Sequence, residues 1–172
     1  SEHGWADLVG PTVCRTLTPD EVAVVRGKLG PDPLNADADP GQFYRAAAKS
    51  SRPIGVILMD QAAISGVGNI FRAESLYRQK IDPLRPGKTL SDDELRRLWD
   101  DNKHLLTIGV RVGRIITTEQ QDRPGIPETE AWPDHANYVY MRHGQKCPRC
   151  SATIRMEEIA GRKLYWCPGC QK

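Results

Sequence analysis

Residues 147–170 read CPRC-SATIRMEEIAGRKLYW-CPGC, and this stretch decides the fold of the C-terminal part of the chain. It contains two Cys-x-x-Cys knuckles, Cys147 with Cys150 and Cys167 with Cys170, separated by sixteen residues. Each knuckle turns tightly enough to direct two thiolates at one ion, and the spacing lies in the range of four-cysteine zinc sites. The sequence therefore predicts a small metal-bound module.

Four thiolates complete a tetrahedron and leave no position for water, so the predicted cofactor is one structural Zn²⁺. A module of about 30 residues has too little apolar core to fold alone, and metal binding supplies the missing stability. An iron–sulfur cluster and a redox-active cysteine pair are the competing interpretations. The second copy of the knuckle and the hairpin between the two copies favour zinc.

The segment between the knuckles is expected to fold back as a β-hairpin with its tip at Ala160-Gly161-Arg162-Lys163. Gly161 permits the turn, and the cations of Arg162 and Lys163 project beside it. A basic tip on a rigid metal scaffold is suited to contacting a phosphate. On the evidence of charge alone, a solvent-exposed turn without a binding role is an equally good interpretation.

The whole chain has 172 residues, 39% of them apolar, and a mean hydropathy of −0.53. These values fit one ordinary domain or two small ones, and they exclude collagen-like, coiled-coil and low-complexity classes. No run approaches the roughly 18 apolar residues of a membrane span. Residues 1–7 lack the basic and apolar regions of a signal peptide. We therefore expect no membrane contact.

Cysteine number and charge point to the compartment and the partner. Five cysteines, an odd number, argue against a disulfide framework and for a reducing, cytoplasmic location. Cys14, far from the other four, is expected to be a small buried side chain.

Residues 1–40 carry three Lys/Arg against seven Asp/Glu, whereas residues 134–172 carry seven against three. A basic module beside a metal site suggests an anionic partner, most simply nucleic acid.

The chain before the knuckles is predicted to be helical. Thr18-Pro19-Asp20-Glu21 and Ser91-Asp92-Asp93-Glu94 are capping boxes that start two helices. The expected helices are residues 18–29, 41–49, 54–64, 70–80 and 91–116, the last being one long helix or two joined near Gly109. A loop is expected at 119–137, with short strands at 138–140, 153–155 and 163–166. The fold class is mainly α, followed by a small β-hairpin module.

A glycine turn, Ser65-Gly66-Val67-Gly68-Asn69, joins two of the predicted helices. Free N–H groups and the helix dipole at the start of the second helix favour an anion. Asn69 is able to cap that helix, to donate its amide to a phosphate oxygen, or to do both in turn. A Gly-x-Gly-Asn turn is by itself more often a plain tight turn than a binding site.

In combination, these motifs resemble the bacterial DNA glycosylases of the formamidopyrimidine-glycosylase/endonuclease VIII family. The similarity to the family's helix–two-turn–helix segment rests on Leu58-Met59-Asp60-Gln61, Gly66-Val67-Gly68-Asn69-Ile70, Glu74-Ser75-Leu76 and Ile81-Asp82-Pro83. Asn137-Tyr138-Val139-Tyr140, the two knuckles and the residues from Gly161 to Lys172 look like the family's zinc finger. The resemblance covers about residues 28–172.

The resemblance implies a domain organisation. Residues 1–39 would be the tail of an N-terminal catalytic domain and a linker, with an interdomain junction at Leu29-Gly30-Pro31-Asp32-Pro33-Leu34. Residues 40–135 would form a helix–two-turn–helix DNA-binding domain, and residues 136–172 the zinc finger.

The resemblance also implies DNA contacts. Asn69 matches the asparagine of the two-turn motif, and Arg162 matches the zinc-finger arginine. In the family these residues grip the phosphates that flank the damaged nucleotide. Their chain neighbours Gly68 and Lys163 are assigned to the same contact. The implied partner is double-stranded DNA with damaged bases or abasic sites, bound by a monomer associated with the nucleoid.

Two departures from the family pattern affect the expected activity. Gln61-Ala62 is more like endonuclease VIII, which favours oxidised pyrimidines, than like a formamidopyrimidine glycosylase. Family enzymes begin with a proline whose amine forms a Schiff base, followed by a glutamate, whereas this chain begins Ser1-Glu2. The match at Glu2 is best explained by chance.

We therefore expect no catalytic residue in this chain, which would be the DNA-binding half of a bifunctional glycosylase/AP lyase of base excision repair. The alternative is a non-catalytic DNA- or protein-binding zinc module. Trp132, Tyr138 and Tyr140 are able to stack on bases, but aromatic residues beside a β module are more often core.

Overall fold

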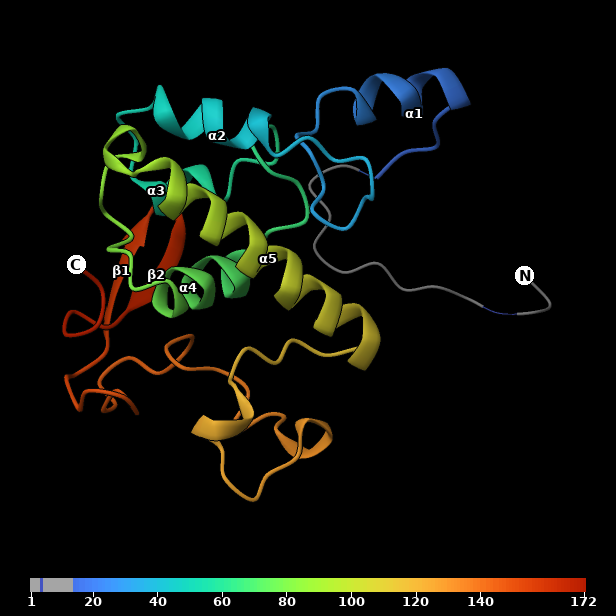
Figure 1. The fold of residues 1–172 in the computed structure, drawn as a ribbon. Coiled ribbons are helices and arrows are strands. Elements are labelled where there is room, and N and C mark those ends of the chain that lie inside the picture. The colour runs from blue at the N-terminus through green and yellow to red at the C-terminus, as the bar shows by residue number, and fades with distance from the viewer. Residues whose placement is uncertain (1–3, 5–13) are drawn as a thin grey trace.

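The computed structural model describes residue 4 and residues 14–172, so the predictions for Ser1 and Glu2 lie outside the described residues. Helices come first and a hairpin follows, as expected (Figure 1). The helices are α1 (Pro19–Arg26), α2 (Gly41–Ala48), α3 (Ile54–Ile57), α4 (Asn69–Arg78) and α5 (Asp92–Val112), with 3-10 turns at Gly87–Thr89, Gln120–Asp122 and Glu128–Glu130. The antiparallel strands are β1 (Arg155–Ile159) and β2 (Arg162–Trp166).

α5 forms one side of the apolar core of the helical domain. Its predicted capping box is present: the Ser91 hydroxyl accepts the Glu94 N–H, and the Glu94 carboxylate accepts the Ser91 N–H. Its Leu95 and Leu98 are buried in one cluster with apolar side chains of α2, α3 and α4. α5 is a single helix, and it ends at Gly113, whose φ of +70° closes it in the left-handed conformation. Among the described residues, no helix combines the length and apolar character needed to cross a membrane.

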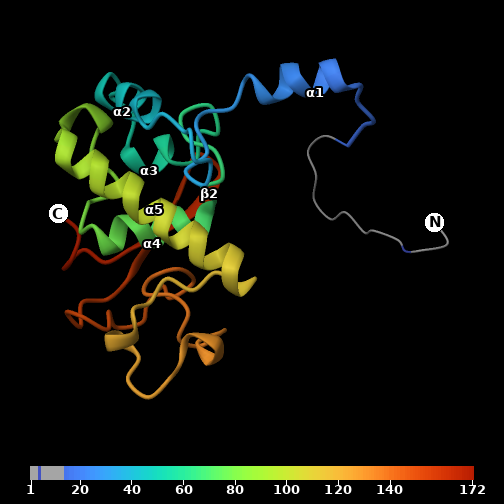
Figure 2. The same cartoon turned by 45° about the vertical axis from the view of Figure 1, so that its right-hand side comes forward.

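α1 stands apart from this core (Figure 2). Its capping box at Thr18 and Glu21 is present, but within the described chain α1 buries none of its side chains. The side chain of Val24 is 63% exposed. Cys14, expected to be buried, is exposed, because the described chain just before α1 lies away from the packed helices.

α3 is shorter than the predicted helix at 54–64, because the Ala62 N–H donates to the Asp60 carboxylate (3.1 Å) instead of continuing the helix. The side chain of Gln61 binds the backbone of the glycine turn that follows. Its Nε2 donates to the Val67 carbonyl (2.9 Å), and its Oε1 accepts the Gly66 N–H (3.0 Å). Gly66 has a φ of +84°, which glycine adopts without strain. At the predicted junction, a Cβ on Gly30 would lie 2.7 Å from the Ala62 carbonyl oxygen, so the close approach there requires glycine.

The prediction of a strand at 138–140 is wrong. The N–H groups of Tyr138, Val139 and Tyr140 all donate to the carboxylate of Glu74, at 2.7, 2.8 and 2.7 Å. They are therefore unavailable for pairing with another strand. The strand expected at 153–155 begins at Arg155 instead. The hairpin tip is confirmed, with Ile159 opposite Arg162.

The zinc-finger module shares its apolar core with the helical domain. Ala73 and Tyr77 of α4 belong to the same buried cluster as Ile154, Tyr165 and Cys167. The last turn of the chain adds polar contacts, since the Gln171 amide donates to the Ile81 carbonyl and accepts the Cys167 N–H. The hairpin therefore lies directly against α4 (Figure 1).

Candidate nucleic-acid interface and metal centre

The four predicted zinc ligands converge. The Sγ atoms of Cys147, Cys150, Cys167 and Cys170 all lie within 4.8 Å of one another. The Cys147–Cys170 and Cys150–Cys167 sulfur pairs are separated by 3.8 and 3.3 Å. Four sulfurs at about 2.3 Å from one tetrahedral zinc are roughly 3.8 Å apart. The donor set and its dimensions therefore suit one zinc ion.

The backbone of the knuckles explains why the sulfurs converge. Cys147 and Cys167 each accept an N–H from the residue four positions later, Ser151 (2.9 Å) and Gln171 (3.0 Å) respectively. These bonds close each knuckle into a tight turn. A Cβ on Gly169 would lie 2.8 Å from the Cys150 sulfur, so the second knuckle requires glycine at this position.

Asn69 is the first residue of α4, while Gly68 occupies the N-cap position. Asn69 therefore does not cap the helix, and its side chain reaches the finger instead. Its Nδ2 donates to the backbone carbonyl of Lys163 at 3.0 Å, and its Oδ1 accepts from Arg72. This bond joins positions 94 residues apart and brings the glycine turn beside the base of the hairpin tip.

Arg162 and Lys163 of β2 are both exposed next to this bond. Gly68 precedes Asn69, and apart from its two chain neighbours no described residue has an atom within 4 Å of the position that a Cβ on Gly68 would occupy. The fold thus leaves open space at Gly68, in contrast to Gly169. The structure brings together the four residues predicted to contact DNA: Gly68, Asn69, Arg162 and Lys163.

Arg72 is a member of this cluster that the sequence analysis missed. It is 1% exposed, and its Nη atoms donate to the carbonyls of Gly55 (3.4 Å) and Lys163 (3.1 Å) and to Asn69. Within the described chain its Nε has no acceptor and the guanidinium forms no ion pair with a carboxylate. Burial, and secondly the charge of Arg162, lower the pKa of Arg72 to about 10. Arg72 is thus still charged at neutral pH.

The sequence analysis named Glu74 only as part of the family resemblance and missed its structural role, although a carboxylate among the apolar residues of a helix is a signal. It is fully buried and accepts the hydroxyl of Thr117 (2.6 Å) as well as the three N–H groups of residues 138–140. Burial raises the pKa of Glu74, while these hydrogen bonds act in the opposite direction. Glu74 therefore holds residues 138–140, which lead into the finger, against α4.

The three candidate stacking residues have different environments. Tyr138 is core, 1% exposed and stacked on Tyr77 with ring centroids 4.9 Å apart. Tyr140 is half-buried with an edge contact to Tyr165. Trp132 is 42% exposed. Trp132 and Tyr140 line a hollow of about 370 Å³ together with Ile70, the residue that follows Asn69.

Comparison with known proteins assigns a class to this arrangement. Residues 29–121 match the formamidopyrimidine-DNA glycosylase H2TH domain, and residues 144–172 match the zinc finger found in FPG and IleRS. The chain belongs to the family of the formamidopyrimidine-DNA glycosylase H2TH domain.

Individual relatives agree. The chain is 45% identical over 166 residues to endonuclease 8 1 of Mycobacterium bovis, covering 96% of this chain and 61% of that protein. It is 38% identical to formamidopyrimidine-DNA glycosylase of Thermus thermophilus, covering 84% and 54%. The structure of Lactococcus lactis Fpg in complex with DNA containing an abasic site superposes with a TM-score of 0.71 at 28% identity, covering 91% and 57%. The chain thus spans little more than half the length of these relatives.

Proposed function

We propose that this chain binds double-stranded DNA at damaged bases or abasic sites by holding two phosphates, one at Asn69 and one at Arg162. The single observation that carries the proposal is the 3.0 Å hydrogen bond from Asn69 to the Lys163 carbonyl. It places a free helix N-terminus and an exposed basic strand on one surface, and each of these binds phosphate. The Asn69 amide has a second N–H available for a phosphate oxygen.

The charge of the cluster supports the same proposal. Arg72, Arg162 and Lys163 gather around Asn69, and the charges of Arg72 and Arg162 repel each other. A phosphate that approaches the cluster offsets this repulsion. In a cluster with a purely structural role, a carboxylate side chain would offset it instead. The hollow beside Ile70 and Trp132 has room for a base displaced from the duplex.

We further propose that the protein acts as an endonuclease VIII-type glycosylase/AP lyase on oxidised pyrimidines, and that this chain supplies binding and no nucleophile. Gln61, which holds the glycine turn, and the similarity to endonuclease 8 1 support the subfamily. Borohydride treatment of the chain with abasic-site DNA should then trap no covalent complex. A trapped complex would show that the chain carries its own nucleophile.

The phosphate contacts are tested by fluorescence anisotropy with a duplex containing an abasic-site analogue. Arg162→Gln should weaken binding by about 1–3 kcal/mol and reduce the salt-dependence slope by about 1. Arg155→Gln, which removes an exposed arginine from the neighbouring strand, is the matched control and should bind as the unmodified chain does. Equal affinity of both variants would contradict the assignment of Arg162.

Gly68→Ala separates a folding role from a binding role. Because a Cβ at Gly68 meets open space, this variant should unfold at the same temperature as the unmodified chain. It should nevertheless bind the duplex at least about tenfold more weakly if the DNA backbone approaches this turn closely. If Gly68→Ala and Arg162→Gln together leave DNA affinity unchanged, the alternative of a protein-binding zinc module becomes the better one.

A further inference from the structure

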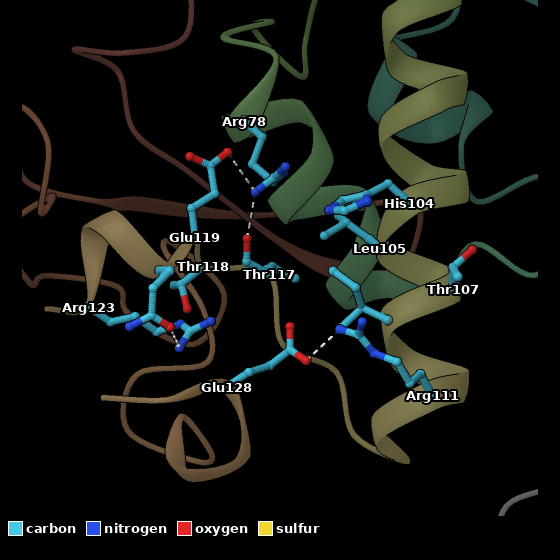
Figure 3. Close-up of a pocket in the computed structure, with 12 residues that line it drawn as sticks. Arg78, His104, Leu105, Thr107, Arg111, Thr117, Thr118, Glu119, Arg123 and Glu128 are labelled. Atoms are coloured by element: carbon cyan, nitrogen blue, oxygen red, sulfur yellow. Dashed lines mark hydrogen bonds and ion pairs between the residues drawn. The ribbon is translucent and has the colours of Figure 1, made fainter. Parts of the chain in front are cut away.

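The loop of residues 119–137, here called the connecting loop, runs from the helical domain to the finger. Between its first half and α5 lies a hollow of about 460 Å³, bordered by His104, Leu105 and Ile108 on the helix side and by Glu119, Arg123 and Glu128 on the loop side (Figure 3). The loop therefore does not pack continuously on α5. Ala131 and Ala136 in its second half are buried against Ile116 and Val112, whereas its first half is held by a few separate polar contacts.

Arginines of two helices hold the loop on one side. Arg78 of α4 donates to the Thr117 carbonyl (2.8 Å) and pairs with Glu119 (3.2 Å) (Figure 3). Arg111 of α5 pairs with Glu128 at 2.6 Å, across the hollow (Figure 3). These contacts connect the loop to the helical domain.

Arg149 of the finger contacts the same part of the loop. It lies inside the first knuckle, between the zinc ligands Cys147 and Cys150. Its guanidinium carbon is 4.6 Å from the ring centre of Tyr138 and 5.5 Å from that of Tyr77. From there its Nη2 donates to the Asp122 carboxylate at 2.7 Å. The side chain thus passes from the metal centre over two aromatic rings to the loop.

The hydroxyl of Tyr138 completes this contact. It donates to the Asp122 carboxylate, and it accepts the Glu119 N–H (2.8 Å) and an N–H of Arg149 (3.2 Å). The side chains of Arg149 and Asp122 are only 27% and 21% exposed, so this ion pair is partly shielded from water. Partly buried and stacked pairs of this kind contribute more than exposed surface pairs do.

We propose that Arg149 is a positioning residue that transmits the geometry of the zinc centre to the connecting loop. The knuckle fixes the backbone of Arg149, Arg149 fixes Asp122 and Glu119, and the far end of the same loop carries Trp132 to the hollow beside Ile70. Zinc then orders the loop that borders the proposed DNA site as well as the finger itself. The consequence for DNA binding rests on the proposed function, but the contact between Arg149 and the connecting loop does not.

Amide hydrogen exchange of the 172-residue zinc-loaded chain, followed by NMR without DNA, tests this proposal. Arg149→Gln should retain one zinc per chain and exchange the Glu119 amide about tenfold faster, because its acceptor Tyr138 loses a partner. Arg155→Gln removes an exposed arginine from the same finger and should leave this exchange rate unchanged. Unchanged exchange at Glu119 in zinc-loaded Arg149→Gln would overturn the proposal.

A second variant decides the matter if Arg149→Gln fails to retain zinc. Tyr138→Phe removes only the hydroxyl that contacts Glu119, Asp122 and Arg149, and leaves the ring stacked on Tyr77. Because this variant removes the acceptor of the Glu119 N–H itself, its readout is the Asp122 amide, which donates to the Glu119 carbonyl within the loop (3.0 Å). Exchange of the Asp122 amide should be faster with full zinc content, and an unchanged rate would contradict the proposal. Because no DNA is present in this experiment, a negative result does not contradict the proposed phosphate contacts. Conversely, if Arg162→Gln fails to weaken DNA binding, the proposed contact between Arg149 and the loop is not contradicted.

Discussion

In the helical domain, Phe43, Ile54, Leu58, Leu95 and Leu98 are each 0% exposed and pack in one apolar cluster. Where the finger packs on α4, the corresponding interior contains two zinc ligands, a stacked pair of tyrosines and the carboxylate of Glu74. The first region is stabilised by burial of apolar surface, which is distributed over many side chains. The second depends on a few specific bonds, so single changes there should have larger and more local effects.

Removal of zinc should have the largest effect, and it should affect the finger and the helical domain differently. A chelator, or Cys167→Ala, should unfold the finger, since zinc binding contributes about 10–16 kcal/mol in isolated finger peptides. The amides of α5 should remain protected because their cluster contains no metal ligand among the described residues. NMR of the chelated chain measures both regions at once, and simultaneous loss of α5 would show that the two regions fold as one unit.

Glu74→Gln should destabilise the chain by about 3 kcal/mol, since an amide nitrogen would then face buried N–H or hydroxyl donors. The loss should appear as faster amide exchange at residues 138–140. Leu98→Ala, a substitution at the centre of the apolar cluster, should cost a similar 2–5 kcal/mol, as roughly expected for a buried leucine. Leu98→Ala should leave the order of the amide exchange rates of residues 138–140 as it is in the unmodified chain. Denaturant titration of both variants provides the free energies of unfolding.

Gly169→Ala should weaken zinc binding by about 1–3 kcal/mol, because its Cβ would press against the Cys150 sulfur. Gly68→Ala is the matched control, since the same added methyl group meets open space there. Competition with a chromogenic zinc chelator measures the two affinities. Equal zinc affinity in both variants would show that the second knuckle relaxes without loss.

The smallest effect should be the response of α5 to acid. Hydrogen bonds from Arg85, opposed by burial, and a further bond from Ser91 lower the pKa of Glu94 from 4.5 to about 2. A lowered folded-state pKa stabilises the protein above pH 4.5, and this contribution is lost as the pH falls from 4.5 towards 2. Glu94→Gln should therefore lower the melting temperature slightly at pH 7 and by less at pH 3. A difference that does not shrink on acidification would exclude this carboxylate as the cause.

Local sequence patterns were sufficient for several elements. The capping boxes at Thr18 and Ser91, the glycine turn and the spacing of the knuckles each act within a few turns of chain. Predictions failed where a side chain competed for the backbone. Asp60 accepts the Ala62 N–H that would have extended α3, and Glu74 accepts the N–H groups that would have paired residues 138–140 in a sheet.

The sequence by itself determined the metal ligands, the mainly helical order of elements and the residue types around the candidate DNA site, because each depends on spacing along the chain. Only the tertiary structure decided that Asn69 contacts Lys163 rather than capping its own helix, and that Arg72 lies buried between them. It also decided that Arg149 reaches Asp122 across two tyrosine rings. These contacts join residues 27 to 94 positions apart, and their geometry arises only when α4 packs against the hairpin and the first knuckle.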